Sequence, residues 1–206
     1  MSNPQYHVII IGAGISGMYQ LWRLRKLGFA VRVFEAGSGV GGTWYWNRYP
    51  GCRFDSESYS YGYSFSKEIL DEWDWTEHFS PQPETLRYLN FVADKLDVRK
   101  DITFHARVKS AVYDDADRHW TIELEDSTKA VANILISATG PLSAPQMPNI
   151  PGVSDYLGEA YHTGMWPREV DGYGPANITF EGKRVGVIGT GATGVQVIQE
   201  VAKTAG

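Results

Sequence analysis

The sequence predicts an α/β fold in which short strands and helices alternate. Two observations carry this prediction. A β-branched run, Tyr6 to Ile11, leads into a glycine-rich turn and then into a helical pattern, and the same order of strand, turn and helix returns at Arg184. Because such connections are right-handed and join parallel strands, we expect each helix to pack on a parallel sheet.

The composition is that of a globular protein. The chain has 206 residues, of which 43% are hydrophobic and 21% charged, with a net charge of -5. This acidic balance offers no basic surface for nucleic acid or an anionic membrane, and the apolar run Val8 to Ile11 is too short for a membrane span. The lone Cys52 has no ligand-spaced partner, so we expect no metal, no internal disulfide and a cytoplasmic location.

The first half of the chain has a clear periodic pattern on both sides of a long irregular segment. Met18, Leu21 and Leu24 lie on one face of the first predicted helix, which Gly28 ends. A second strand is expected over Ala30 to Glu35. Residues 37 to 80 show no sustained period and predict an extended loop, whereas Glu84 to Leu96 has apolar residues at helical spacing.

Three strand-like runs follow and predict a β-meander. They cover Ile102 to Tyr113, His119 to Glu125 and Ala130 to Ala138, with Asp114, Asp115 and Asp117 marking one turn. Four prolines between Pro141 and Pro151 then indicate a domain boundary. We therefore expect a first domain over 1–140, a linker over 141–182 and the start of a second domain over 183–206. That second domain has one strand and one helix, which cannot bury their own faces, so the chain is expected to be truncated.

The first glycine turn has the spacing of a dinucleotide-binding fingerprint. Gly12 permits the tight turn, Gly14 lets the backbone approach a pyrophosphate, and Gly17 allows close packing of helix on strand. The phosphates would meet the amides near Ile15 and Ser16, at the positive end of the helix.

Glu35 ends the second strand, where its carboxylate would accept hydrogen bonds from a ribose 2′-hydroxyl. This favours FAD or NAD over NADP, because a carboxylate repels a 2′-phosphate. The alternative is a solvated carboxylate at a strand end.

The second glycine turn repeats the fingerprint over residues 189 to 194, GTGATG. The residue that would contact its ribose lies past Gly206, so the choice between NADPH and NADH is not visible. Two such turns nevertheless suggest two dinucleotides, typically a bound flavin and a diffusible nicotinamide. The run Ile134 to Gly140 is either a strand passing beneath a bound cofactor or an ordinary core strand.

Two longer motifs carry a family resemblance. Residues 41 to 55, GGTWYWNRYPGCRFD, match the Baeyer-Villiger monooxygenase pattern of a glycine pair, tryptophan, aromatic-Pro-Gly and aspartate. Residues 156 to 167, YLGEAYHTGMWP, match the family fingerprint FxGxxxHTxxWP except that Tyr156 replaces phenylalanine. The chain resembles, over essentially its whole length, the amino-terminal portion of a type I Baeyer-Villiger monooxygenase.

This resemblance implies a Rossmann-like flavoprotein that binds two dinucleotides, FAD and NADPH. Such enzymes form a flavin C4a-peroxide from dioxygen and insert one oxygen atom next to a ketone carbonyl, giving an ester or lactone. The residues implied to bind FAD are Gly12, Gly14, Ser16, Gly17, Glu35, Thr43, Trp44, Asp55, Tyr61 and Val108. Those implied to bind NADPH are Arg53, Gly189, Thr190, Gly191, Ala192, Thr193, Gly194 and Val195.

The resemblance also implies that the chain is incomplete as a catalyst. Asp55 would orient an arginine that keeps the peroxide anionic, and that arginine belongs to a later part of the enzyme, so the isolated chain is expected to be inactive. Tyr61-Gly62-Tyr63-Ser64 stands where the family often has a cysteine at the second position, and His162 and Trp166 are expected to be structural. Two alternatives stay open: a heteroatom-oxidising flavin monooxygenase, and a non-catalytic FAD-binding fragment.

Overall fold

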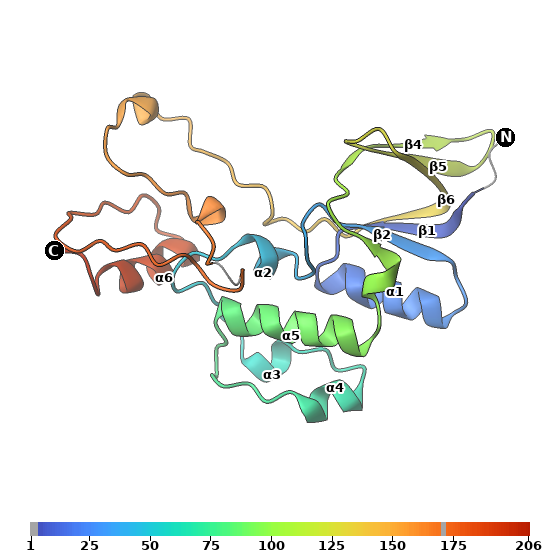
Figure 1. Ribbon diagram of the computed structural model, residues 1–206, viewed down its shortest axis with the longest axis horizontal. Coiled ribbons are helices and arrows are strands. Elements are labelled where there is room, and N and C mark those ends of the chain that lie inside the picture. Colours follow the sequence, from blue (N-terminus) through green and yellow to red (C-terminus); the bar gives the residue numbers. More distant parts are fainter. Residues whose placement is uncertain (1–3, 170–171) are drawn as a thin grey trace. The chain divides into compact units, whose positions relative to one another are not determined.

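The computed structural model describes residues 4–169 and 172–206, and the chain forms two compact units (Figure 1). The first unit comprises Met1–Tyr45 and Leu89–Gly140, and the second comprises Trp46–Tyr88 and Pro141–Gly206. Most of the irregular segment, residues 46–80, therefore belongs with the carboxyl-terminal third of the chain.

A six-stranded mixed sheet forms the first unit. Its order is β3-β2-β1-β6-β5-β4, in which β3, β2, β1 and β6 are parallel while β6, β5 and β4 form an antiparallel meander. The predicted α/β class and the β-meander are thus confirmed. The strands are β1 (Tyr6–Ile11), β2 (Val31–Phe34), β3 (Ile102–Thr103), β4 (Val108–Asp114), β5 (His119–Leu124) and β6 (Lys129–Ser137).

Helix α1 (Ile15–Lys26) packs on this sheet beside β1 and β2 (Figure 1). Met18 and Leu21 are fully buried, as the apolar period predicts, and Gly28 has a φ of +85° just beyond the helix end. Helix α5 (Gln82–Lys95) buries Leu86, Leu89, Val92 and Ala93, and the short 3-10 turn η1 (Arg99–Asp101) follows it. Amphipathic spacing alone therefore located both long helices of this half.

The second unit is built mainly from loops and short helices. The helices are α2 (Thr43–Trp46, at the boundary), α3 (Ser58–Tyr61), α4 (Lys67–Glu72), η2 (Val153–Asp155), η3 (Thr163–Met165) and α6 (Ala192–Val201). None of the helices in the described part of the chain is long and apolar enough to cross a membrane. The segment between β6 and η2 has no helix or strand.

Three sequence predictions of secondary structure are wrong. Residues 37 to 80 contain the short helices α2, α3 and α4 rather than loop alone, and α4 begins because the Ser66 hydroxyl accepts the Ile69 amide (3.4 Å). The predicted strand Ile102 to Tyr113 is divided at His105, whose φ of +54° breaks the extended run. Residues 184 to 188 form no strand, because no described residue pairs with them in a ladder.

Replacing Gly17 tests how tightly α1 is packed against the glycine turn. A Cβ at Gly17 would lie 1.9 Å from the Gly12 carbonyl oxygen, a backbone atom that cannot move aside cheaply. We expect Gly17→Ala to lower the free energy of unfolding by about 2 to 3 kcal/mol in urea titrations. Gly186→Ala is the control, since a Cβ there meets nothing within 4 Å, and it should change stability by less than about 0.5 kcal/mol. Equal effects of the two substitutions would contradict the packing argument.

Candidate functional site

The first glycine turn places the amino end of α1 against the carboxyl end of β1. Gly12 has a φ of +101°, and a Cβ there would lie 2.6 Å from the Ala138 carbonyl oxygen at the end of β6. Gly14 caps the helix without a side-chain bond, and the first turn of α1 has no acidic residue. The first-turn amides therefore form a positive helix end with no acidic side chain in the same turn, which suits an anion.

The second glycine turn has nearly the same backbone as the first. Gly189 has a φ of +113°, and the helix cap Gly191 has φ −77° and ψ −176°, against −78° and −168° at Gly14. A Cβ at Gly194 would lie 2.4 Å from the Gly189 carbonyl oxygen, which repeats the contact between Gly17 and Gly12. The chain thus contains two glycine turns of one design, one in each unit, and each leads into a helix amino end of the kind that suits an anion.

Glu35 lies buried beside the first turn, with 4% of its surface exposed. Its Oε2 accepts the Ala13 amide (2.7 Å) and its Oε1 accepts the Gly37 amide (2.7 Å), so the carboxylate is fixed in place. Each carboxylate oxygen can accept a second hydrogen bond. Glu35 therefore has the capacity to accept a ribose hydroxyl without losing the two bonds that orient it.

The remaining residues of the first unit that were predicted to bind FAD are Thr43, Trp44 and Val108. The Gly41 amide donates to the Ala13 carbonyl (3.1 Å), and a Cβ at Gly42 would lie 2.8 Å from Gly14 Cα. Thr43 and the buried Trp44, the first residues of α2, directly follow Gly42, which lies against this turn. Val108 packs against the sheet core at the start of β4.

Asp55, in the second unit, is held in an aromatic surrounding. Its neighbour Phe54 is buried and stacks on Tyr61 with ring centroids 4.2 Å apart and planes at 11°. Asp55 itself is exposed, and no described residue donates a hydrogen bond to its carboxylate. The structure therefore stacks Tyr61 on the residue that precedes Asp55 and leaves the Asp55 carboxylate accessible.

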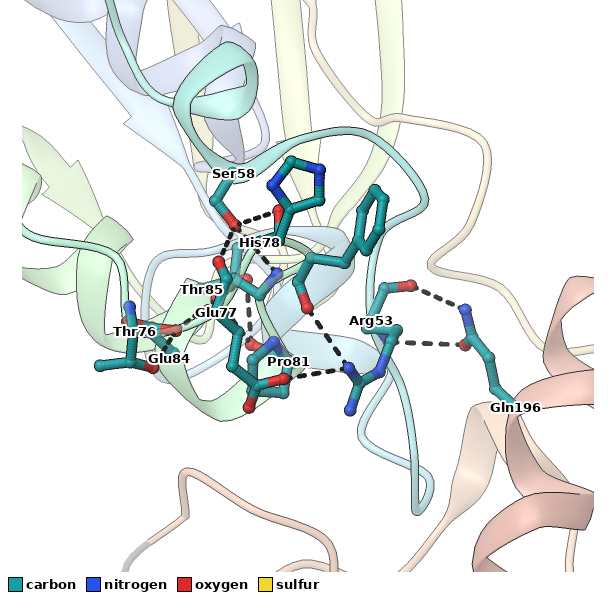
Figure 2. A network of polar contacts seen from close by, with 11 residues as sticks. Arg53, Ser58, Thr76, Glu77, His78, Pro81, Glu84, Thr85 and Gln196 are labelled. Carbon is teal, nitrogen blue, oxygen red and sulfur yellow. Dashed lines mark hydrogen bonds and ion pairs between the residues drawn. The ribbon is translucent and has the colours of Figure 1, made fainter.

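The Arg53 side chain extends toward the loop that carries Glu77 (Figure 2). Its Nη1 pairs with Glu77 Oε2 (3.1 Å) and donates to the Phe79 carbonyl (3.4 Å). Both charged side chains are partly exposed, and such ion pairs contribute only about 0 to 1 kcal/mol. The pairing therefore leaves Arg53 able to exchange Glu77 for a ligand phosphate or amide at little cost.

A buried polar network supports the loop that carries these residues (Figure 2). Glu84 accepts the Thr76 amide (2.8 Å), the Thr76 hydroxyl (2.9 Å) and the Ser80 hydroxyl (2.8 Å). The Ser58 hydroxyl accepts the Ser80 amide (3.0 Å) and donates to the Glu77 carbonyl (2.7 Å). Because every oxygen of the Glu84 carboxylate has a donor, this buried charge fixes the loop rather than destabilising it.

The backbone before Asp55 is joined to this network and to α6. The Gln82 amide donates to the Cys52 carbonyl (2.8 Å), and Arg53 forms an antiparallel bridge with Pro81. On the other side, Gln196 Nε2 donates to the Arg53 carbonyl (3.0 Å). Between loop and helix lies an open hollow of about 340 Å³, lined by Arg53, Asp55 and Phe79 and by Ala192, Val195 and Gln196.

Comparisons with known proteins agree with this arrangement. Residues 10–69 match the model of an NAD(P)-binding Rossmann-like domain, and residues 56–206 match the model of L-lysine 6-monooxygenase/L-ornithine 5-monooxygenase. The chain belongs to this monooxygenase family. Relatives of the chain include a Baeyer-Villiger monooxygenase of Pseudooceanicola batsensis, 42% identical over 97% of the chain, so the resemblance seen in the sequence is confirmed.

Several relatives match nearly all of the chain. The 2-oxo-Δ3-4,5,5-trimethylcyclopentenylacetyl-CoA monooxygenase of Pseudomonas putida is 51% identical over 98% of this chain, and the acetone monooxygenase of a Gordonia species is 48% identical over 98%. A solved structure titled OTEMO complex with FAD and NADP has a TM-score of 0.93 over 99% of the chain. The chain spans 37% of each of these two curated relatives and 38% of that solved chain.

Sequence reasoning missed the residues that hold the Asp55 loop. Gln196 and Ser58 act through contacts with residues far along the chain, whereas Glu84 bonds to Thr76 and Ser80, eight and four residues before it. A weak signal was present for Glu84, since an acidic residue in the first turn of a helix often bonds backward to the chain before the helix. No signal of this kind pointed to Gln196.

The Glu84 network can be tested by removing its acceptor. Glu84→Leu leaves the Thr76 amide and two hydroxyls without their partner, so we expect the free energy of unfolding to fall by about 3 kcal/mol. Glu84→Gln keeps one acceptor for the amide, and its NH₂ group can donate to the hydroxyls, so a loss of about 1 kcal/mol is expected. Urea unfolding measures both. A loss in the glutamine variant as large as in the leucine variant would show that the network is not what holds the loop.

Stability at high pH depends on two buried groups of the same loop. Burial raises the pKa of the Cys52 thiol from 9.0 to about 12, and burial first, then nearby Cys52, raises that of Tyr49 from 10.0 to about 12. The unfolded chain loses these protons at a lower pH than the folded chain. The stabilisation is therefore complete below pH 9 and is lost as the pH rises from 9 toward 12.

Cys52→Ala should remove the part of this decline that begins near pH 9. We expect the pH dependence of its free energy of unfolding to be flatter than that of the wild type by about 1 kcal/mol per pH unit between pH 9 and 10, where the tyrosine contributes less than the thiol because its ordinary pKa is 10.0. Urea unfolding at half-unit intervals gives both curves. Parallel curves would show that the thiol is not buried as described.

Proposed function

We propose that the complete protein carrying this chain is an FAD- and NADPH-dependent Baeyer-Villiger monooxygenase. It would insert one oxygen atom from dioxygen next to a ketone carbonyl and release an ester or lactone. The observation that supports this most strongly is the pair of matching glycine turns, with Glu35 beside the first and an accessible Asp55 in a loop bonded to the helix of the second.

The residues present fit both cofactors. Two helix amino ends without acidic residues or side-chain caps are suited to two pyrophosphates. Glu35 has remaining acceptor capacity for the ribose of FAD. The FAD-binding set would be Gly12, Gly14, Ser16, Gly17, Glu35, Thr43, Trp44, Asp55, Tyr61 and Val108, and the NADPH-binding set Arg53 and residues 189–195. When bound and reduced, the flavin supplies the activation of dioxygen.

The residues of this chain would bind the two cofactors and orient the groups around them. The first-turn amides of α1 and α6 hold phosphates, and Arg53 can leave Glu77 to contact the nicotinamide side. Asp55 stays accessible to orient a cation supplied by the rest of the protein, which would stabilise negative charge near the ketone. Its neighbours Phe54 and Tyr61 restrict water on one side by stacking.

The proposed domain organisation follows these roles. Residues 1–140 contribute the FAD-binding part, 141–182 a linker and 183–206 the opening of the NADP-binding part, with the remaining strands and the catalytic cation supplied by other parts of the protein. A cytoplasmic location, supported by the lone Cys52, belongs to the same proposal.

A second candidate is oxidation of a heteroatom, such as an amine nitrogen. The observation that favours it is the match of residues 56–206 to the lysine and ornithine monooxygenase model, together with 46% identity to a phenazine N-monooxygenase of Lysobacter antibioticus. Both reactions would use the same cofactors, so product analysis distinguishes them.

The test is turnover by the complete protein with NADPH, oxygen and a small cyclic ketone, with products identified by mass spectrometry. Lactone formation supports the ketone reaction, whereas an N-oxide or hydroxylamine from an amine substrate without lactone would favour the second candidate. We expect Asp55→Asn to lower kcat for lactone formation by about 100-fold. Asp74→Asn, a change of the same kind at an exposed position, is the control and should leave kcat unchanged. Wild-type turnover by Asp55→Asn would contradict the role of Asp55.

A further inference from the structure

The side-chain amide of Gln196 pairs with the backbone of Arg53 on both its edges (Figure 2). Gln196 Nε2 donates to the Arg53 carbonyl (3.0 Å), and the Arg53 amide donates to Gln196 Oε1 (3.4 Å). This is the pattern that a neighbouring β-strand would offer to an exposed backbone. A single side chain of α6 thus replaces one rung of a β-ladder.

The orientation of the Gln196 amide is fixed by a third bond. The Tyr49 hydroxyl donates to the same Oε1 (2.8 Å) and lies near the Thr193 hydroxyl (3.3 Å) on the preceding turn of α6. With its NH₂ and oxygen exchanged, Gln196 would present donors to the Tyr49 hydroxyl and the Arg53 amide and an oxygen to the Arg53 carbonyl. Burial keeps Tyr49 protonated, so it remains a donor at neutral pH.

The loop can approach α6 this closely because residue 51 is glycine. Gly51 has a φ of +79°, and a Cβ there would lie 2.7 Å from the Gln196 carbonyl oxygen and 3.0 Å from Glu200 Cγ. Any side chain at this position would separate the loop from the helix. The contact is therefore built from three independent features: the Gln196 amide, the Tyr49 hydroxyl and the absence of a side chain at Gly51.

The contact joins the segment that carries Asp55 to the helix that follows the second glycine turn. Arg53 precedes Asp55 by two residues, and Gln196 lies in the second turn of α6, whose amino end follows the second glycine turn. We propose that Gln196 is a positioning residue that fixes the Arg53–Asp55 segment to this helix, so that a nicotinamide dinucleotide bound at residues 189–195 also orders the segment carrying Asp55. This coupling rests on the proposed function, because it requires the second turn to bind that ligand.

Hydrogen–deuterium exchange of the complete protein, with and without NADP⁺, tests the coupling. In the wild type, NADP⁺ should slow exchange in both 189–195 and 49–55. Gln196→Met keeps the length of the side chain but removes its donor and acceptor. We expect ligand-free exchange in 49–55 to be about 5-fold faster, as for loss of a typical hydrogen bond. NADP⁺ should still slow exchange in 189–195 of this variant but no longer in 49–55.

Two further variants make the result specific. Gln199→Met makes the same change at an exposed position of α6 and should match the wild type in both segments. Tyr49→Phe removes one bond to Gln196 and leaves the two to the Arg53 backbone, so exchange in 49–55 should lie between wild type and Gln196→Met. This milder variant keeps the test decisive if Gln196→Met does not fold.

The outcomes that overturn the proposal differ from those that overturn the proposed function. If exchange of 49–55 in Gln196→Met equals that of the wild type in both ligand states, the positioning role of Gln196 is refuted. Loss of the NADP⁺ response in both segments would show that Gln196 acts on overall stability rather than on positioning. If NADP⁺ does not change exchange of 189–195 in the wild type, the proposed function fails and the coupling fails with it. The ligand-free exchange of 49–55 still decides whether Gln196 positions this segment.

Discussion

The close contact between the last and first glycines of each turn is the constraint on which the rest of the structure depends. In both turns the helix begins so close to the first glycine that a Cβ on the last glycine would overlap the carbonyl oxygen of the first. This contact holds the amino end of each helix close against its own turn, where the first-turn amides of α1 and α6 form a positive helix end that suits an anion. In the first unit the same geometry brings the Ala13 amide within reach of Glu35 and so fixes the carboxylate beside the turn.

The second consequence of this constraint concerns the loop with Asp55. Once α6 begins at the second turn, its side chains fall on fixed positions, and Gln196 faces the Arg53 backbone (Figure 2). On its other side the loop is joined to the Glu84 network through Pro81 and Gln82. The aspartate is therefore exposed at its carboxylate while the backbone around it is hydrogen-bonded on two sides.

Most of the first unit could be predicted from the sequence because its signals are local. The period of Met18 and Leu21, the glycine spacing and the β-branched run of β1 each depend on neighbouring residues. The errors arose where distant partners decide. His105 breaks its strand while its amide bonds to the Gly37 carbonyl (3.0 Å), and residues 184 to 188 have strand composition without a described strand to pair with.

The residues of the candidate site likewise fall into those that a local sequence pattern marks and those that only a distant partner explains. Glycine turns and a strand-end glutamate have fixed spacings, so Gly12, Gly189 and Glu35 could be identified from the sequence alone. Gln196 and Arg53 are separated by 143 residues, and a glutamine in an amphipathic helix carries no sign of its partner. Such positioning contacts become visible only when the fold brings the two segments together.

The central claim is that the first glycine turn, with Glu35, forms part of a flavin site. The most direct measurement is the absorbance spectrum of the purified protein after incubation with FAD and gel filtration, compared for the wild type and Glu35→Leu. The account predicts a protein-bound flavin band in the wild type that is lost or strongly reduced in the variant while both remain folded. A folded wild-type protein that retains no flavin, or a variant that retains as much as the wild type, would contradict it.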